Sequence, residues 1–505
     1  MADAADVASS SIPGPAALVV RTVEPAAPAA PAAAPGAPAA ALRAAIPVAA
    51  SSAATPAAPV LALPAEELPA AAPGPAKPTH VGQLARSKPV DVLCMAAADA
   101  SCNFKPRALQ RRPVGAHDVL IDLRYCGICH TDLHCAAGQA PVLGDVIGMA
   151  APGETALVPG HELAGVCVAV GERVTLVKVG DHVGVGNVAG SCLECAACKS
   201  GHEEICSKSS NTYGARDKSG INETYPLGSF TLGGYSSATV VHERFCIIAP
   251  KSYPLECVGP VMCAGVTVFN PLVAYGAGQG TRVGVVALGG LGQMAVKMAK
   301  AMGCIVTVVT STPSKAVFAR ECGAEYVIVS SSAAEMEAAR KVRSLDLIID
   351  TSCVDHDVFV LMKLLARGGK YVQIGVTASW VATFMLGAMV GGKGSSLRSS
   401  MIGGISMTQE AINFCAKHNI RPTIELINVE GINKAFELLS NNSHGGVRFV
   451  IDLKNGGLKS FEEASERCYG VPAPKLREVP EAELVEANRA FSLMCRYICS
   501  CWCFW

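Results

Sequence analysis

The chain has 505 residues, more than one hydrophobic core usually organises, so two or more domains are expected. Its 42 basic residues balance 42 acidic residues, and no basic stripe follows any segment, which argues against a nucleic-acid-binding surface. The 22 cysteines and the lack of a secretory signal peptide indicate reduced thiols and metal ligands in a reducing compartment.

An alanine- and proline-rich tract with few aromatic residues occupies residues 1–85. A segment of this composition cannot form a packed core, so we predict a disordered extension. A plastid transit peptide would be rich in arginine and poor in acids, whereas Asp3, Asp6 and Glu24 come early in this chain. We therefore expect a cytoplasmic protein, with plastid targeting as the alternative.

Residues 88–255 are predicted to form a β-rich domain. Apolar side chains alternate at Val119, Ile121 and Leu123, and short apolar runs further along the chain are punctuated by glycine. Alternation of this kind is typical of half-buried strands.

From residue 282 the pattern changes to an alternation of strands and helices. We predict strands at Val283–Leu288, Ile305–Thr310, Tyr326–Val329, Leu345–Asp350 and Lys370–Gly375, and helices at Gln293–Met302 and Ser314–Cys322. This order predicts a doubly wound parallel sheet, an α/β Rossmann domain, which we assign to residues 256–407.

A return segment over residues 408–454 is expected to complete the first domain. It contains a predicted helix at Thr408–His418, a strand at Thr423–Ile427, a helix at Ile432–Leu439 and a strand at Arg448–Leu453. Within the Rossmann region, the apolar stretch Val376–Gly392 is short and interrupted by polar residues, so we expect a subunit contact rather than a membrane span. Residues 455–505 form a cysteine-dense C-terminal extension of unknown role, either a passive tail or a metal or redox segment.

A compact group of four cysteines has the spacing C-x2-C-x2-C-x7-C: Cys192, Cys195, Cys198 and Cys206. Four thiolates this close can make a closed tetrahedral shell, which is how structural zinc is held. The alternative is a zinc knuckle that grips nucleic acid. The neighbouring residues are apolar or acidic, as at Glu203 and Glu204, and acidic groups would repel phosphates.

Three further ligand-type residues are dispersed along the chain: Cys129, His161 and Cys263. Taken singly, each is as well explained by a buried thiol or a buried histidine. Together and in this order, they resemble the zinc-dependent medium-chain alcohol dehydrogenases, most closely the cinnamyl-alcohol-dehydrogenase-like aldehyde reductases. The resemblance extends over about residues 88–454 and includes the motifs around Gly233-Gly234-Tyr235, Gly403-Gly404 and Arg448-Phe449-Val450.

The resemblance implies a role for each of several residues. Cys129, His161 and Cys263 would hold a catalytic zinc with one open position, Glu162 would approach that metal when the open position is vacated, Thr131 would contact the substrate oxygen, His134 would relay the proton, and His130 would lie near the cofactor pyrophosphate. Asp132 would orient the zinc-binding histidine; a local hydrogen bond from Asp132 to the backbone is an equal alternative.

The dinucleotide motif is Ala287-Leu288-Gly289-Gly290-Leu291-Gly292, after a predicted strand and before a predicted helix. We expect Gly289, Gly290, Leu291 and Gly292 to contact the cofactor, because glycine lets the backbone approach a pyrophosphate. Ala287 replaces the first glycine of the usual fingerprint. The cost of this replacement depends on whether the turn requires a positive φ.

The next predicted strand ends in Thr310-Ser311-Thr312, followed closely by Lys315. An NAD enzyme would place a carboxylate here for the ribose 2′-hydroxyl, and none is present in this stretch. Hydroxyl groups and a lysine suit a 2′-phosphate, so NADP is expected. The alternative is that Lys315 only begins the following helix.

These observations predict an NADP-dependent, zinc-containing alcohol dehydrogenase that works mainly as an aldehyde reductase. The resemblance implies a GroES-like catalytic domain, a Rossmann domain, two zinc ions per chain and a homodimer. The expected partner is a small aldehyde or alcohol, with no nucleic acid and no membrane. The alternative is a redox-inactive, zinc-containing relative that acts as a binding or scaffold protein. The physiological substrate stays open.

Overall fold

The computed structural model describes residues 89–97, 100–138, 157–222, 224, 227–375, 396–441 and 443–454. Three of the expectations fall outside this part of the chain. They concern the alanine- and proline-rich tract, the apolar stretch Val376–Gly392 and the C-terminal extension.

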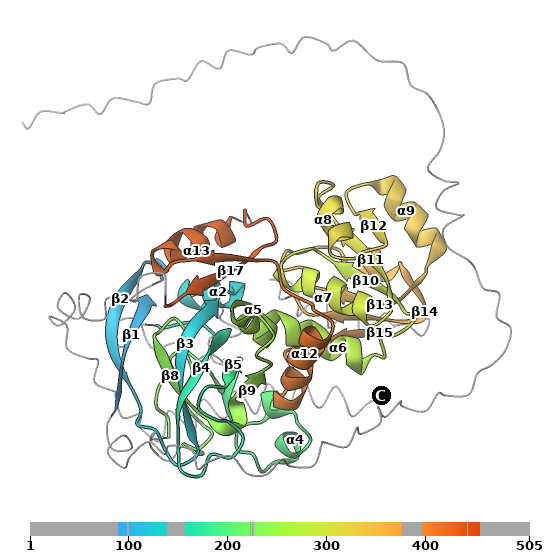
Figure 1. The fold of residues 1–505 in the computed structure, drawn as a ribbon. Coiled ribbons are helices and arrows are strands. Elements are labelled where there is room, and N and C mark those ends of the chain that lie inside the picture. The colour runs from blue at the N-terminus through green and yellow to red at the C-terminus, as the bar shows by residue number, and fades with distance from the viewer. Residues whose placement is uncertain are drawn as a thin grey trace, which may run out of the picture. The chain divides into compact units, whose positions relative to one another are not determined.

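A seven-stranded sheet forms the β-rich part of the structure (Figure 1). Its order is β16-β17-β3-β4-β5-β9, with β8 paired to β3. The strands are β3 (Asp118–Gly127), β4 (Leu163–Val170), β5 (His182–Val185), β8 (Ala238–His242), β9 (Ile247–Ala249), β16 (Ile424–Ile427) and β17 (Arg448–Asp452). Val119, Ile121 and Leu123 of β3 are buried in one core cluster, as their alternation predicts. The prediction of a β-rich part is therefore confirmed.

The return segment joins this sheet. Strand β17 pairs antiparallel with β3, with Val450 opposite Gly127. Helix α12 (Ile405–Lys417) and helix α13 (Ile432–Ser440) precede β16 and β17, respectively. The strand and helix positions agree with the predicted ones to within a few residues, whereas the division into domains stays a prediction.

A second, six-stranded sheet is parallel throughout, in the order β12-β11-β10-β13-β14-β15. The strands are β10 (Arg282–Val286), β11 (Ile305–Thr310), β12 (Tyr326–Val329), β13 (Leu345–Asp350), β14 (Leu365–Gln373) and β15 (Ser396–Ser399). This is the strand order of a doubly wound dinucleotide-binding sheet. The order in which successive strands are added to the sheet reverses between β10 and β13. The Rossmann prediction is confirmed, and β11, β12 and β13 have the predicted bounds.

The remaining elements were mostly not predicted. They include β1 (Val90–Ala97), β2 (Phe104–Arg111), β6 (Val188–Gly190), β7 (Ser210–Asn211), α9 (Ala333–Val342) and α10 (Val358–Met362), beside the predicted α7 (Gly290–Ala301) and α8 (Lys315–Glu321). The shortest of these, β6, β7 and α10, carry too few periods of side-chain alternation to be recognised from sequence.

The most important unpredicted element is a helical stretch of 20 residues, Leu255–Ala274. It comprises α5 (Leu255–Pro260), a π-helical turn η4 (Val261–Gly265) and α6 (Val266–Ala274). By length and hydropathy this stretch could cross a membrane, but 83% of the most apolar window is buried. Its first part, α5, packs against β3 and β4, and its later parts, η4 and α6, pack against α7 (Figure 1). An apolar helix that is mostly buried between other elements is a core helix.

The turn between β10 and α7 requires a left-handed backbone. Ala287 has a φ of 66°, and its N–H donates to Val309 O at 2.9 Å. A Cβ atom at Gly292 would lie 2.3 Å from Ala287 O, so only glycine fits where the helix meets the turn. The predicted strand extended to Leu288, whereas β10 ends at Val286 because the chain turns at Ala287.

A buried carboxylate closes the end of the central strand β13. Asp350 accepts hydrogen bonds from Tyr371 Oη at 2.6 Å and pairs with His356 Nε2 at 2.9 Å. The hydrogen bond to Asp350 raises the pKa of His356 to about 8, although burial acts in the opposite direction. The imidazolium–carboxylate pair thus fixes the segment that follows β13.

We expect the Asp350–His356 pair to stabilise the fold in a pH-dependent way. The pKa of His356 is about 8 in the folded chain, against an ordinary value near 6.5, so the pair stabilises fully below about pH 6.5 and loses this effect as the pH rises through 8. His356→Gln should cost about 2 kcal/mol at pH 6 and much less at pH 9. Urea midpoints at both pH values measure this, with His418→Gln as a surface control. An equal cost at both pH values would contradict the ionic pairing.

Ala287→Gly should stabilise the chain. A left-handed backbone costs a non-glycine residue about 1–2 kcal/mol, and the greater freedom of glycine in the unfolded chain offsets about half of this. We expect a net gain of about 0.5–1 kcal/mol in the free energy of unfolding. Ala338→Gly, inside α9, is the matched control and should destabilise by about 1 kcal/mol. If both variants lost stability equally, Ala287 would not be strained.

Candidate functional site

The compact group of cysteines surrounds one point in a loop after β6. The Sγ–Sγ distances are 3.5 Å for Cys206–Cys192, 3.6 Å for Cys195–Cys198 and 3.9 Å for Cys192–Cys198. Four thiolates around a tetrahedral zinc, with Zn–S near 2.3 Å, would be about 3.8 Å apart. The group therefore has the size and chemistry of a closed zinc shell.

Two features of this loop favour a structural metal shell over a surface that binds nucleic acid. Backbone N–H groups of Glu194 and Cys195 lower the pKa of Cys192 to about 6, which favours the thiolate that binds metal. Glu203 is buried and accepts a hydrogen bond from Ile405 N at 3.0 Å, at the first turn of α12. The loop is thus attached to the start of α12 through an acidic side chain.

The dispersed group (Cys129, His161 and Cys263) converges from three separate segments. Cys129 precedes helix α2 (His130–Ala136), His161 precedes β4, and Cys263 lies in the π-helical turn η4. Cys129 Sγ and Cys263 Sγ are 3.9 Å apart, and His161 Nε2 lies 3.2 Å from Cys263 Sγ. A hydrogen bond from Cys263 lowers the pKa of Cys129 well below its ordinary value. Two thiolates and one imidazole at these distances fit a tetrahedral zinc with one open position.

Asp132 holds the dispersed group in register. Its carboxylate accepts a hydrogen bond from Cys129 N at 2.9 Å, lies 3.2 Å from His161 Nδ1, and accepts one from Tyr235 Oη at 3.2 Å. The backbone contact and the histidine contact, which the sequence left as alternatives, both occur. With Nδ1 engaged by the carboxylate, the Nε2 atom of His161 is turned toward Cys263.

Glu162 is fully buried beside the dispersed group, with its carboxylate within 4.8 Å of the three ligand atoms. Burial raises the pKa of Glu162 to about 7, although Arg448 opposes the shift. Arg448 Nη1 lies 3.2 Å from Oε1, but neither carboxylate oxygen makes a hydrogen bond of good geometry to any described residue. An unsatisfied buried carboxylate here is close enough to approach a metal.

Arg448 is a candidate functional residue to which the sequence analysis assigned no role. Its guanidinium is buried, and Nη1 donates to Ile128 O at 3.0 Å. A Cβ atom at Gly290 would lie 3.1 Å from Nε and Nη2 of Arg448. Both nitrogens are without a hydrogen-bond partner in the described part of the chain. The sequence signal was only its place in the family motif Arg448-Phe449-Val450.

The dinucleotide motif has the geometry of a phosphate cradle. Helix α7 begins at Gly290 with Gly289 as its N-cap residue, and a Cβ at Gly289 would meet no atom within 4 Å. The N–H groups of this helix start and the unpartnered nitrogens of Arg448 lie together, and both suit a pyrophosphate. The motif therefore fits a dinucleotide, with Leu291 in the first turn.

The residues expected at the 2′-phosphate lie at the carboxyl end of β11. Thr310 ends the strand, and Ser311 and Thr312 are exposed beyond it. Lys315 begins α8, and its Nζ donates to Leu288 O at 3.5 Å, beside the glycine motif. The structure thus brings the two parts of the expected cofactor site together.

The other expected residues follow Cys129 on α2. Thr131 Oγ1 lies 3.6 Å from Cys129 Sγ, so its hydroxyl borders the dispersed group. His134 is half-buried in the last turn, and its ring lies 6.3 Å from that of His130.

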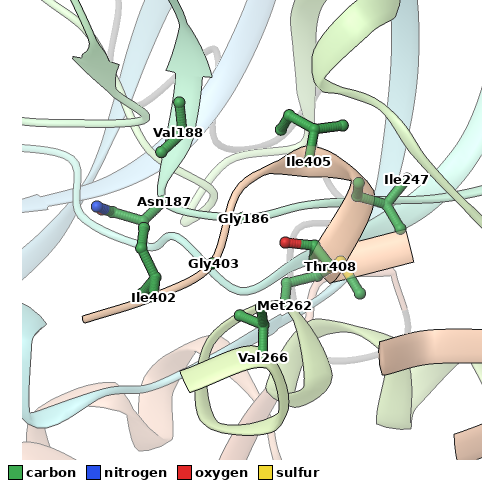
Figure 2. Close-up of a pocket in the computed structure, with 10 residues that line it drawn as sticks. All are labelled: Gly186, Asn187, Val188, Ile247, Met262, Val266, Ile402, Gly403, Ile405 and Thr408. Carbon is green, nitrogen blue, oxygen red and sulfur yellow. The ribbon is translucent and has the colours of Figure 1, made fainter. Parts of the chain in front are cut away.

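A small cavity lies beyond this site, where Met262, Ile402 and Thr408 approach one another (Figure 2). Its volume of about 10 Å³ is sufficient for about one water molecule and is too small for an organic substrate. This cavity is therefore not the substrate cleft.

Comparisons with known proteins agree with this geometry. The family described as "Alcohol dehydrogenase GroES-like domain" matches residues 115–251, and "Zinc-binding dehydrogenase" matches residues 290–417. A probable cinnamyl alcohol dehydrogenase of Oryza sativa subsp. japonica is 40% identical over 363 residues, which cover 72% of this chain and 93% of the relative. An 8-hydroxygeraniol dehydrogenase of Catharanthus roseus is 39% identical over 369 residues, which cover 73% of this chain and 96% of the relative.

A solved structure of a Helicobacter pylori cinnamyl alcohol dehydrogenase complexed with NADP(H) is similar as well. It has a TM-score of 0.62 and 35% sequence identity, and the match covers 73% of this chain and all of the other. The fold, the two cysteine-containing groups and these relatives agree. The chain belongs to the zinc-dependent medium-chain alcohol dehydrogenases, in the cinnamyl-alcohol-dehydrogenase-like group, and is an NADP-dependent zinc oxidoreductase of alcohols and aldehydes.

Proposed function

We propose that this enzyme works mainly as an NADPH-dependent reductase of small aldehydes, with the dispersed group as its catalytic metal site. The convergence of Cys129, His161 and Cys263 from three distant segments supports the proposal. When bound, zinc supplies a Lewis acid that polarises a carbonyl, and NADPH supplies the hydride. The relatives act on alcohols by name, and the reverse reaction would use the same groups.

The side chains of α2 would then handle the substrate oxygen and its proton. The Thr131 hydroxyl, next to Cys129, would hydrogen bond to that oxygen. His134, half-buried in the last turn of α2, would exchange the proton with solvent. Asp132 would keep His161 in the tautomer that presents Nε2. Glu162 would approach the metal when the substrate position is vacated.

The cofactor would lie along the carboxyl edge of the parallel sheet. The starting N–H groups of α7 and the Arg448 guanidinium would hold its pyrophosphate. Ser311, Thr312 and Lys315 would hold the 2′-phosphate, since hydroxyl and ammonium groups pair with a phosphate and a carboxylate would repel it. His130, at the start of α2, would complete the pyrophosphate site.

We also propose two zinc ions per chain and a homodimer. Support for the first comes from the two groups of ligand atoms, each within 4.8 Å. Support for the second comes from the family resemblance; light scattering of the purified chain tests it.

The reductase activity is tested by NADPH oxidation against a panel of aliphatic, aromatic and terpenoid aldehydes, with NADH in parallel. We expect a higher kcat/KM with NADPH. Ser311→Asp should weaken NADPH binding and reduce this preference, because a carboxylate would face the 2′-phosphate. Ser252→Asp, in the turn after β9, introduces the same charge and should change the binding of neither NADPH nor NADH. A higher kcat/KM with NADH in the wild type would contradict the cofactor assignment, and no turnover of any aldehyde would contradict the reductase assignment.

The two metal groups should respond differently to loss of one thiol. Cys129→Ser should abolish turnover and leave the fold intact, because it removes one of the three ligands of the catalytic metal. Cys195→Ser should lower thermal stability or solubility, because it opens a closed shell. Metal analysis should give about two zinc ions per chain. Cys353→Ser, at an exposed cysteine outside both groups, is the control and should match the wild type. Full activity with one zinc would refute the two-site assignment.

A further inference from the structure

The loop between α13 and β17 lies against the dinucleotide motif. Gly445 and Gly446 have φ angles of 62° and 90°, a path open mainly to glycine. A Cβ at Gly446 would lie 2.9 Å from Leu288 O, and Gln293 Nε2 of α7 donates to Gly446 O at 3.0 Å. Two independent contacts thus fix this loop beside the start of α7.

His444 is the one ionisable side chain of this short turn, Ser443–Val447. Its ring meets the edge of the His130 ring, with centroids 5.4 Å apart and an interplanar angle of 65°. Its Nδ1 atom is buried and has no hydrogen-bond partner among the described residues. A buried ring nitrogen without a partner is costly, so a ligand that satisfies it would bind more tightly.

The groups that face His444 are basic, and they come from three elements. They are His130 of α2, Lys315 of α8 and Arg448 of β17. Burial, together with these three groups, lowers the pKa of His444 to about 4. No carboxylate contributes to this shift. An anion placed among these four side chains would relieve their repulsion and favour protonated His444.

Arg448 gives the independent sign that an anion belongs here. Its side chain is only 6% exposed, and its unpartnered Nε and Nη2 face Gly290 at the start of α7. His444 and Arg448 therefore flank the same helix start from one loop and its following strand.

We propose that His444 donates a hydrogen bond to the pyrophosphate of NADP(H) and takes up a proton when the cofactor binds. This inference rests on the proposed cofactor site and adds a residue that the motif does not contain. The pyrophosphate, rather than the 2′-phosphate, is assigned because the His444 ring packs against that of His130, and because Gly446 of the same turn lies beside Leu288 and Gly289.

The test is calorimetric binding of NADPH, NADH and 2′-AMP to the zinc-loaded full chain. His444→Phe keeps a ring against His130 but removes both nitrogens, and His444→Gln keeps a donor. His418→Phe is the control, since His418 is exposed at the end of α12 and also packs against an aromatic ring, that of Phe414. Zinc content and thermal unfolding temperature verify that each variant is folded.

We expect His444→Phe to weaken NADPH and NADH binding alike, by about tenfold, with a smaller loss for His444→Gln. Binding of 2′-AMP, which lacks a pyrophosphate, should not change. Titrations near pH 6.5 in two buffers of different ionisation enthalpy should show less proton uptake by His444→Phe than by the wild type. The cofactor phosphates and His130 are common to both proteins, so the difference isolates His444.

Unchanged NADPH and NADH affinity in His444→Phe would overturn the inference. A loss confined to NADPH and 2′-AMP would overturn the pyrophosphate assignment, because it would place His444 at the 2′-phosphate. A wild-type chain that binds neither NADPH nor NADH would overturn the proposed cofactor site itself, and this inference with it.

Discussion

The buried guanidinium of Arg448 is the constraint that links the two candidate sites, the dispersed group and the dinucleotide motif. A charge removed from water must be paired and hydrogen bonded, or the fold loses several kcal/mol, on the order of 3–5. Arg448 meets this demand only in part, since Nη1 donates to Ile128 O before α2 and lies 3.2 Å from the Glu162 carboxylate beside the dispersed ligands. Its remaining nitrogens lie at Gly290, where the nucleotide helix begins. One side chain therefore links the metal-type site, the phosphate cradle and the return strand β17.

The rest of the metal-type site is held by rigid elements rather than by loops alone. Asp132 joins the start of α2, the segment before β4 and Tyr235 through hydrogen bonds to a single carboxylate. Cys263 lies in a π-helical turn of the helical stretch Leu255–Ala274. This stretch packs against β3 and β4 of the seven-stranded sheet and against α7 of the Rossmann part. Such turns interrupt the regular helix and re-aim one side chain, and they are frequent at functional sites. The geometry of three ligands thus follows from packing of the core.

The local charge of the cofactor region differs from that of the whole chain. The formal net charge is zero, yet His130, Lys315, His444 and Arg448 gather around the start of α7 with no carboxylate among the groups that shift the pKa of His444. Glu162 lies on the other side of Arg448, toward the dispersed ligands. Basic groups therefore lie on one side of Arg448, and the candidate metal ligands lie on the other. Net charge constrains solubility and long-range steering, whereas binding is decided by such local fields.

The sequence alone determined the elements whose pattern is local. The strands β11, β12 and β13 were predicted with their observed bounds, because strands of a parallel sheet read as nearly continuous apolar runs. The compact cysteine group was recognisable because four cysteines so close in sequence can surround one metal ion without help from distant segments. Only the tertiary structure decided what depends on distant segments. Arg448 meets Ile128 across 320 positions, Cys263 meets Cys129 across 134 positions, and the turn that carries His444 lies against Leu288 through Gly446. Local patterns encode which residues can be buried or can bind, but the contacts between far segments arise only when the whole core packs.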